Sequence, residues 1–349
     1  MNGDSRRRPK VVVTNRIHPS VLSQLEAVAR VEMNADLEPW TAQNLAGHLH
    51  EADAMMGFMT DRVDQALLDQ APRLRVVACA LKGFDNYDVE ACTRAGVWLS
   101  IVPDLLTVPT AELAIGLAIA LARNIRAGDA LVRGGQFKGW RPRLYGTGLA
   151  DSTVAVVGLG CVGRAIAARL AGFGCARIVG VDPAPGRVRG MELLPLGEAL
   201  AQAHYVFVAA PLTPASLKLI DRTALELARP GQFIINVGRG SVVDEHAVSQ
   251  ALDSGRLAGY AADVFAMEDW GLPGRPSAIP PQLLLRGDTL LTPHLGSAVH
   301  DVRMAIEQRA ANNIVAVLQG QAPPDAINVP RAGVPAVGRD DRTPAEGTA

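Results

Sequence analysis

The sequence predicts an α/β protein of two Rossmann-like or flavodoxin-like parallel-sheet domains with a cleft between them. Three observations lead to this prediction. Apolar runs of strand length alternate with helical patterns almost throughout the chain, and a G-x-G-x-x-G motif lies near its middle. In addition, 349 residues are enough to form two separate cores.

The glycine motif consists of Gly158, Gly160 and Gly163. It follows an apolar, β-branched run at 153–157 and opens a helical pattern at 164–172. In this context the first glycine permits a tight turn, the second lets the backbone approach a pyrophosphate, and the third lets helix and strand pack closely. A helix N-terminus also attracts phosphate groups. The motif, with Cys161 and Val162 inside it, therefore predicts a dinucleotide site.

An acidic residue supports this assignment and indicates the kind of dinucleotide. The next apolar run, 178–181, ends at Asp182, which is 19 residues beyond Gly163. A carboxylate at that place hydrogen-bonds the ribose hydroxyls and repels a 2′-phosphate. We therefore expect NAD as the cofactor, in preference to NADP. Three nearby arginines could weaken that preference: Arg177, Arg187 and Arg189.

The other elements follow in order along the chain. In the first part, strands are expected at 11–14, 54–58, 74–80 and 97–102, with helical patterns such as 20–29 and 62–71 between them. A long apolar helix starts near Thr110, where a hydroxyl is followed by Glu112. A second set of strands is expected at 153–157, 178–181, 205–209, 233–236, 259–264 and 289–292. An amphipathic helix then runs from about Ser297 to Leu318.

Because the dinucleotide motif begins near mid-chain, we expect a discontinuous first domain. Residues 9–104 and 299–330 would form a substrate-binding domain, and residues 105–298 would form the NAD-binding domain inserted into it. Residues 1–8 and 331–349 are rich in charge, Pro, Gly and Ala, and are expected to be disordered.

Composition excludes several classes of function. The net charge of −1 indicates no nucleic-acid or membrane partner. No metal-ligand spacing and no signal-peptide pattern is present, and the cysteines Cys79, Cys92, Cys161 and Cys175 are typical of reduced core thiols. We expect a cytoplasmic protein.

Ligands of open parallel sheets bind beyond the carboxyl ends of the strands. Three cationic or titratable side chains follow predicted strands: Lys82, Arg239 and His294. They suit an anionic substrate beside a nicotinamide. The remaining residues at strand ends are candidates for the same cleft: Met59, Gly83, Pro211, Leu212, Val237, Gly238 and Asp263.

Each candidate side chain also has a structural interpretation. Arg239 could cap carbonyl groups, but an arginine between glycines on a strand-end loop suits a bidentate oxyanion contact. His294 could be an ordinary surface histidine, but hydride transfer needs an acid or base that works near pH 7. Glu268 could be a surface acid or the partner of that histidine.

The order Arg239, Glu268, His294 after a G-x-G-x-x-G motif resembles the D-2-hydroxyacid dehydrogenase superfamily over about residues 10–328. More narrowly, the chain resembles the phosphonate (phosphite) dehydrogenases in the segments 80–86, 102–112, 239–245, 259–265, 267–270 and 293–299. Ala266 and the pair Val237-Gly238 depart from the pattern of these relatives.

This resemblance implies a reaction and a set of roles. Phosphite, NAD⁺ and water would give phosphate and NADH. Lys82 and Arg239 would bind phosphite, His294 would act as the base or orient water, and Glu268 would hydrogen-bond His294. Further residues would line or support the substrate site: Met59, Gly83, Trp140, Tyr145, Ser297 and Arg303. Thr110 and Gly296 would join the cofactor site. The resemblance also implies a C2 homodimer that pairs through the region 110–145.

Two alternatives remain open. The first is a D-2-hydroxyacid dehydrogenase that reduces a 2-keto acid, with Arg239 on the carboxylate and His294 on the carbonyl. Lys82 argues against it, because a second cation suits a dianion. The second is an NAD(H)-sensing corepressor, which the complete Arg–Glu–His set disfavours.

Overall fold

The computed structural model describes residues 7–184 and 191–330. The chain divides into two compact units, Met1–Val102 with Ile306–Ala349 and Pro103–Ala305. Each unit contains one parallel sheet, so the predicted fold class of two parallel-sheet α/β domains is correct. The sequence had suggested divisions at 104/105 and 298/299; in the structure the second falls inside the last helix.

The first unit has a five-stranded sheet in the order β2-β1-β3-β4-β5. Its strands are β1 (Lys10–Val13), β2 (Arg30–Met33), β3 (Ala54–Gly57), β4 (Val76–Cys79) and β5 (Trp98–Ser100). The helices α2 (Ala42–Leu49), α3 (Gln65–Leu68) and α4 (Val89–Arg94) pack their leucines, alanines and Cys92 against alternate residues of these strands. The unit also contains α1 (Pro19–Val28) and most of α12 (His300–Leu318). The strand order is that of flavodoxin-like folds.

The second unit has a seven-stranded sheet in the order β12-β11-β10-β9-β6-β7-β8. The strands are β6 (Thr153–Val157), β7 (Arg177–Val181), β8 (Glu192–Leu193), β9 (Tyr205–Val208), β10 (Gln232–Asn236), β11 (Leu257–Ala262) and β12 (Thr289–Leu291). The order reverses beside β6, which is the topological switch point where doubly wound sheets bind dinucleotides.

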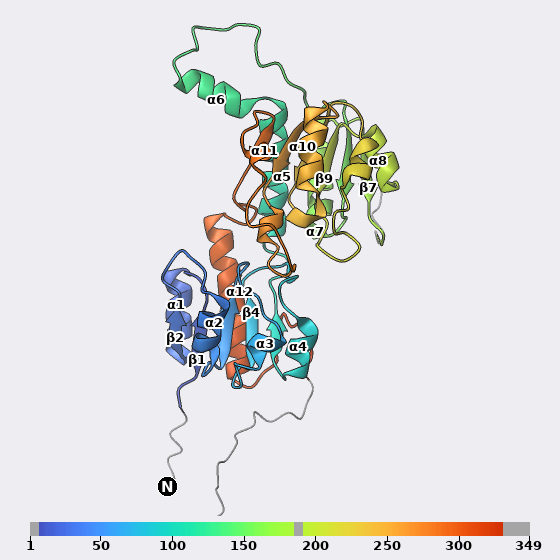
Figure 1. Ribbon diagram of the computed structural model, residues 1–349. Helices are drawn as coiled ribbons and strands as arrows, with labels where there is room; N and C mark the ends of the chain where they lie inside the picture. The colour runs from blue at the N-terminus through green and yellow to red at the C-terminus, as the bar shows by residue number, and fades with distance from the viewer. Residues whose placement is uncertain (1–6, 185–190, 331–349) are drawn as a thin grey trace, which may run out of the picture. The chain divides into compact units, whose positions relative to one another are not determined.

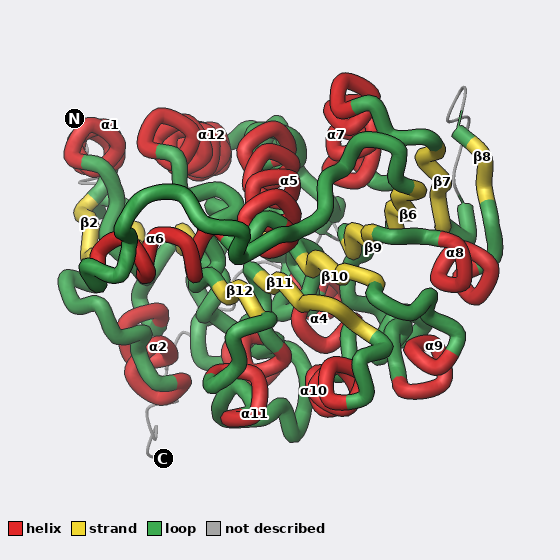
Figure 2. The backbone as a smooth tube through the Cα atoms, turned by 90° about the horizontal axis from the view of Figure 1, so that it is seen from above, coloured by secondary structure: helices red, strands yellow, loops and turns green. Residues whose placement is uncertain are grey.

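Helices cover both faces of this second sheet (Figures 1 and 2). On one face, α5 (Thr107–Ala122) and α7 (Cys161–Leu170) pack against Val154, Val156 and Ile235. On the other lie α8 (Leu196–Gln202), α9 (Arg222–Glu226), α10 (Glu245–Asp253) and α11 (Pro281–Leu284), whose apolar side chains contact Ala155, Val206 and Ile234. Because its central strands are buried on both faces, they read in the sequence as unbroken apolar runs.

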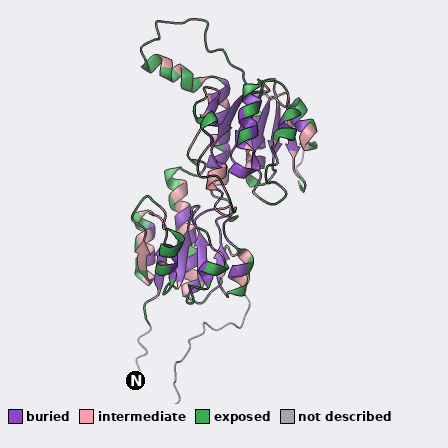
Figure 3. Cartoon of the chain, viewed as in Figure 1, coloured by how far each residue is buried: buried purple, intermediate pink, exposed green. Residues whose placement is uncertain are grey.

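An exposed arm follows α5 in the second unit. The chain turns at Asn124, which has a φ of 54°, and continues as α6 (Ile125–Arg133) at 63° to α5. Segment 134–146 then returns to Ala122, whose carbonyl accepts a hydrogen bond from the Thr147 backbone. Figure 3 shows α6 and this segment as exposed. We call residues 124–146 the arm.

Several local expectations need correction. The 62–71 helix shortens to α3, the long helix begins at Thr107 rather than at Thr110, and β2 and β8 have no counterpart among the expected strands. Cys161 is exposed and Cys175 is half-buried, so only Cys79 and Cys92 are core thiols. Arg7 forms an ion pair with Asp53; residues 1–6 and 331–349, expected to be disordered, lie outside the described residues.

No helix in the described part of the chain is by itself long and apolar enough to cross a membrane. The bent pair α5–α6 meets the length and composition criteria only when the two are taken together.

Candidate active site

The dinucleotide turn forms where β6 meets α7. Gly158 has a φ of 89°, and a Cβ there would lie 2.7 Å from the Ala210 backbone. A Cβ on Gly163 would lie 1.9 Å from the Gly158 carbonyl oxygen. By contrast, a Cβ on Gly160 would meet nothing within 4 Å. The protein therefore needs Gly158 and Gly163 for its own packing, whereas the space at Gly160 is left open, as a pyrophosphate would require.

The glycine turn and the N-terminus of α7 together form the phosphate site, which we call the cradle. Gly160 is its N-cap, and Cys161 and Val162 follow in the first turn, where backbone N–H groups have no partner within the helix. Pro211 and Leu212 follow β9. The loops after β6, β9 and β10 meet at Ala210, because a Cβ on Gly238 would also lie 2.5 Å from the Ala210 carbonyl oxygen. These residues fit the phosphates of a dinucleotide.

Asp182 directly follows β7, as expected. Its Oδ2 accepts a hydrogen bond from Leu159 N at 2.7 Å and its Oδ1 accepts one from Ala184 N at 2.8 Å. These bonds hold the carboxylate beside the glycine turn, and each oxygen keeps a further lone pair for a ribose hydroxyl. Arg177 lies at the opposite end of β7, roughly 16 Å from Asp182 along the strand, and forms an ion pair with Glu192. It therefore does not reach Asp182, while Arg187 and Arg189 lie outside the described residues.

The three expected catalytic side chains follow neighbouring strands of the second sheet. Arg239 follows β10, Glu268 follows β11 in a 3-10 turn, η3 (Ala266–Glu268), and His294 follows β12. His294 Nδ1 lies 2.7 Å from Glu268 Oε2, and both side chains are about three-quarters shielded from solvent. The carboxylate accepts a hydrogen bond from Nδ1–H, which leaves Nε2 as the nitrogen available to exchange a proton with a ligand.

Asp263 holds the loop that carries His294. Its carboxylate accepts hydrogen bonds from Thr292 Oγ1, Leu295 N and Gly296 N at 2.6–2.8 Å. Burial raises the pKa of Asp263, and these hydrogen bonds oppose that shift. His294 has a φ of 56°, in the left-handed region that is uncommon for residues other than glycine. The loop geometry is thus imposed by Asp263 and is strained at the histidine itself.

Thr110 lies near this loop. Its hydroxyl donates to Leu106 O at 2.7 Å and lies 3.2 Å from Gly296 O. It is therefore an interior residue of α5 rather than its cap. Ser297 and Arg303 follow the loop, Ser297 just before α12 and Arg303 in its first turn.

Within the first unit, the candidates Met59, Lys82 and Gly83 follow the neighbouring strands β3 and β4. Met59 packs on the core beneath it. Lys82 Nζ is buried and has no hydrogen-bond partner among the residues that the structure describes. A buried ammonium without a partner is costly unless an anion joins it.

Trp140 and Tyr145 lie on the arm and are 74% and 75% exposed. Asn124 donates a hydrogen bond to Tyr145 O at 3.3 Å, which places this residue at the C-terminal end of α5. Thr110 and the His294 loop lie at the N-terminal end, and the helix rises roughly 18 Å between Thr110 and Ala122. One copy of the second unit therefore does not bring Tyr145 to its own His294.

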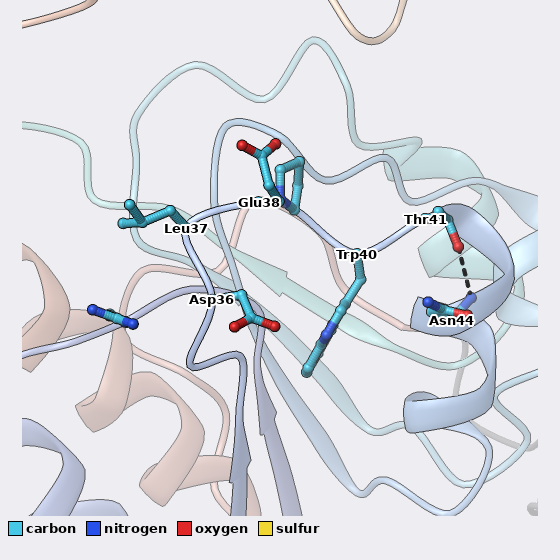
Figure 4. Close-up of a pocket in the computed structure, with 8 residues that line it drawn as sticks. Asp36, Leu37, Glu38, Trp40, Thr41 and Asn44 are labelled. Atoms are coloured by element: carbon cyan, nitrogen blue, oxygen red, sulfur yellow. Dashed lines mark hydrogen bonds between the residues drawn. The ribbon is translucent and has the colours of Figure 1, made fainter.

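A separate hollow of about 530 Å³ lies in the first unit. It is lined by residues of the 36–41 loop with Arg16 and Asn44, and Figure 4 shows the Thr41–Asn44 hydrogen bond at its edge. None of the expected site residues lines it. Within residues 7–184 and 191–330, no group of three metal-ligating side chains is found.

Sequence reasoning missed Asp269, Glu245 and the structural role of Asp263. Asp263 was expected only as a cofactor contact, and the other two were absent from the expected site. Single buried acids in loops or at the first residue of a helix give no periodic signal, so only their contacts reveal them.

A two-unit α/β fold with a dinucleotide turn and an Arg–Glu–His set defines a nucleotide-dependent oxidoreductase. Residues 115–296 match the profile of the D-isomer specific 2-hydroxyacid dehydrogenase NAD-binding domain. The chain is 34% identical over 329 residues to a glyoxylate reductase of Pyrococcus furiosus, covering 92% of this chain and 96% of that protein. A glyoxylate reductase of Aeropyrum pernix is 34% identical over 330 residues, with the same shares covered.

Solved structures agree with this assignment. The TT0316 protein of Thermus thermophilus superimposes with a TM-score of 0.85 at 32% identity, covering 91% of this chain and all of the other. An NADPH-dependent glyoxylate/hydroxypyruvate reductase of Sinorhizobium meliloti, in complex with NADP and malonate, gives 0.82 at 28% identity, covering 94% and 100%. The chain belongs to the D-isomer specific 2-hydroxyacid dehydrogenase family, and its second unit is an NAD-binding domain.

Proposed function

We propose that this protein oxidises phosphite to phosphate and transfers the hydride to NAD⁺. The observation that carries the proposal is Lys82, whose buried Nζ has no hydrogen-bond partner in the described parts of the chain. A monocarboxylate needs one cationic contact, which Arg239 can make bidentately. Phosphite is largely a dianion near neutral pH and suits a second cation. The segments 80–86 and 267–270, which resemble the phosphite dehydrogenases, support the same substrate.

The reaction needs few protein groups. Arg239 and Lys82 bind the phosphite oxygens. His294, with Nδ1 bonded to Glu268, accepts the proton of the attacking water at Nε2. The P–H bond breaks as the water oxygen bonds to phosphorus, and the hydride leaves for the nicotinamide, which serves as its acceptor when bound. The balance is phosphite, water and NAD⁺ to phosphate, NADH and a proton.

A second candidate is reduction of a 2-keto acid such as glyoxylate, and the relatives favour it over phosphite oxidation. Glyoxylate reductases are 34% identical to the chain over most of its length, and one solved neighbour binds the dicarboxylate malonate. Here Arg239 would hold the carboxylate and His294 would donate a proton to the carbonyl oxygen as the hydride arrives from NADH. Arg239, His294 and its partner Glu268 serve both reactions, so the substrate depends on the groups around them.

A direct assay separates the candidates. Absorbance of NADH is followed with NAD⁺ and phosphite, with NAD⁺ and D-lactate, and with NADH and glyoxylate. We expect efficient NADH formation with phosphite. A kcat/KM for glyoxylate higher than the kcat/KM for phosphite would overturn the proposal. No turnover in any assay would favour a nucleotide-sensing protein.

Variants test the role of Lys82 with the same assay. Lys82→Met removes the charge and keeps much of the apolar length. We expect it to raise the KM for phosphite by about 10-fold or more, from the loss of a charge-assisted hydrogen bond of about 1.5–3 kcal/mol. Glyoxylate turnover, if present, should change far less. Lys138→Met, on the exposed arm, is the matched control.

We also propose a C2 homodimer formed through the arm. Its exposed side chains include Ile125, Val132, Phe137, Trp140 and Tyr145. That much apolar surface on one projecting segment favours a protein partner. Light scattering at micromolar concentration should give twice the chain mass of 36.8 kDa, and a monomer mass would refute the proposal.

A further inference from the structure

Two loops of the second unit are in direct backbone contact at the candidate active site. The arginine loop, residues 237–242, carries Arg239, and the acidic turn, residues 265–269, carries Glu268. A Cβ on Gly240 would lie 1.8 Å from the Phe265 carbonyl carbon and 2.1 Å from Ala266 N. Glycine is therefore required where the two backbones meet.

Two buried acids cross-link these loops in opposite directions. Asp269, at the end of the acidic turn, accepts a hydrogen bond from Ser241 N of the arginine loop at 2.7 Å. Glu245, which starts α10 three residues beyond the arginine loop, accepts one from Ala266 N of the acidic turn at 2.9 Å. Asp269 is 2% exposed and Glu245 is 4% exposed. We call this pair of bonds the brace.

The brace is connected to His294 through Glu268. Glu268 Oε1 accepts a hydrogen bond from Phe265 N at 2.8 Å, while its Oε2 meets His294 Nδ1 at 2.7 Å. A displacement of Ala266 would move Phe265 and Glu268 with it, because the three share one short turn. Catalysis of this kind loses rate steeply when a group is misplaced by about 1 Å.

The surroundings of Glu245 are acidic. The titratable groups that face it are Asp244 on its own helix, Glu268 and Asp269 on the acidic turn, and Tyr260 on β11. Burial raises the pKa of Glu245 to about 7; the Ala266 hydrogen bond opposes this shift, and the three neighbouring carboxylates add to it. A neutral Glu245 carboxyl still accepts the Ala266 hydrogen bond through its carbonyl oxygen, without repelling Glu268.

We propose that Glu245 is a positioning residue for the reaction: in its protonated form it holds the acidic turn against the arginine loop and so fixes Glu268 and His294 relative to Arg239. Ionisation of Glu245 places a fourth carboxylate in this cluster and loosens the turn. The inference rests on the proposed roles of Arg239 and His294, and not on the identity of the oxidised anion.

The test compares Glu245→Gln with the unmodified enzyme. Glutamine keeps the acceptor oxygen and cannot ionise. The ratio of the two kcat/KM values, variant over unmodified, is measured from pH 5.5 to 9 with whichever substrate the enzyme turns over. Ionisations of the substrate, the cofactor and residues remote from Glu245 cancel in this ratio. We expect a constant ratio below pH 6 and a rise of about 3- to 10-fold above pH 8, equivalent to about 1 kcal/mol.

The exposed acid Glu198, in the first turn of α8, provides a matched control. Glu198→Gln should give a ratio that does not change with pH. A flat ratio for Glu245→Gln as well would overturn the proposal. An unmodified enzyme that turns over neither phosphite nor a 2-keto acid would instead contradict the proposed function.

Glu245→Ala removes the acceptor altogether. We expect kcat to fall about 10- to 100-fold while the Kd for NAD stays within about 2-fold, because the glycine turn is untouched. A folded Ala variant with unchanged kcat would also overturn the proposal. If this variant does not fold, the glutamine ratio decides alone.

Discussion

Gly160→Ala should abolish tight NAD binding without weakening the fold. The new Cβ meets no atom within 4 Å, and Gly160 has an extended backbone, with φ −63° and ψ −168°, that alanine adopts freely. Replacing glycine with alanine gains about 0.4–1 kcal/mol through the unfolded state, and because alanine is a poorer N-cap than glycine, the start of α7 loses a similar amount. We therefore expect the melting temperature to stay level within about 2 °C.

The same methyl group occupies the space that a pyrophosphate needs. Losing one charge-assisted hydrogen bond from the α7 N-terminus costs about 1.5–3 kcal/mol, so the Kd for NAD should rise about 10- to 100-fold. Calorimetric titration and thermal unfolding measure the two effects on one sample. Gly172→Ala, also in open space but outside the nucleotide turn, should leave the Kd for NAD unchanged. Gly163→Ala should unfold the unit instead, because its Cβ would lie 1.9 Å from a backbone oxygen. An NAD affinity unchanged in Gly160→Ala would refute this account of the cradle.

Three further predictions concern the described side chains. His294→Ala should lower kcat about 10²- to 10⁴-fold at unchanged NAD affinity, and near-normal turnover would show that another group handles the proton. Asp182→Ala should shift the ratio of kcat/KM values toward NADP, and a variant with the unmodified ratio would contradict the ribose assignment. Because burial raises the pKa of Glu245 to about 7, the folded state keeps a proton that the unfolded chain releases above its ordinary pKa of about 4.3. Stability should therefore fall as the pH rises from about 4.5 to 7, by up to about 3 kcal/mol, and Glu245→Gln should not show this loss in urea unfolding.

The sequence determined the fold class and the nucleotide site because both depend on local patterns. Central strands buried on both faces appear as continuous apolar runs, and the spacing of Gly158, Gly160, Gly163 and Asp182 directly encodes a turn, a helix start and a strand end. Strand-end positions also pointed to Arg239 and His294. The short strands β2 and β8 were missed since their residues are exposed or only partly buried.

Only the tertiary structure decided how the site is held together. The contact of Gly240 with Ala266 and the bonds from Glu245 and Asp269 join segments about 20–30 residues apart in the chain. No periodicity records such contacts, because they arise when neighbouring strands bring their loops to one edge of the sheet. The positive φ of His294 and the place of Tyr145 at the far end of α5 have the same origin. Local spacing specifies elements and their termini, whereas packing between distant segments sets the positions of the groups that do the chemistry.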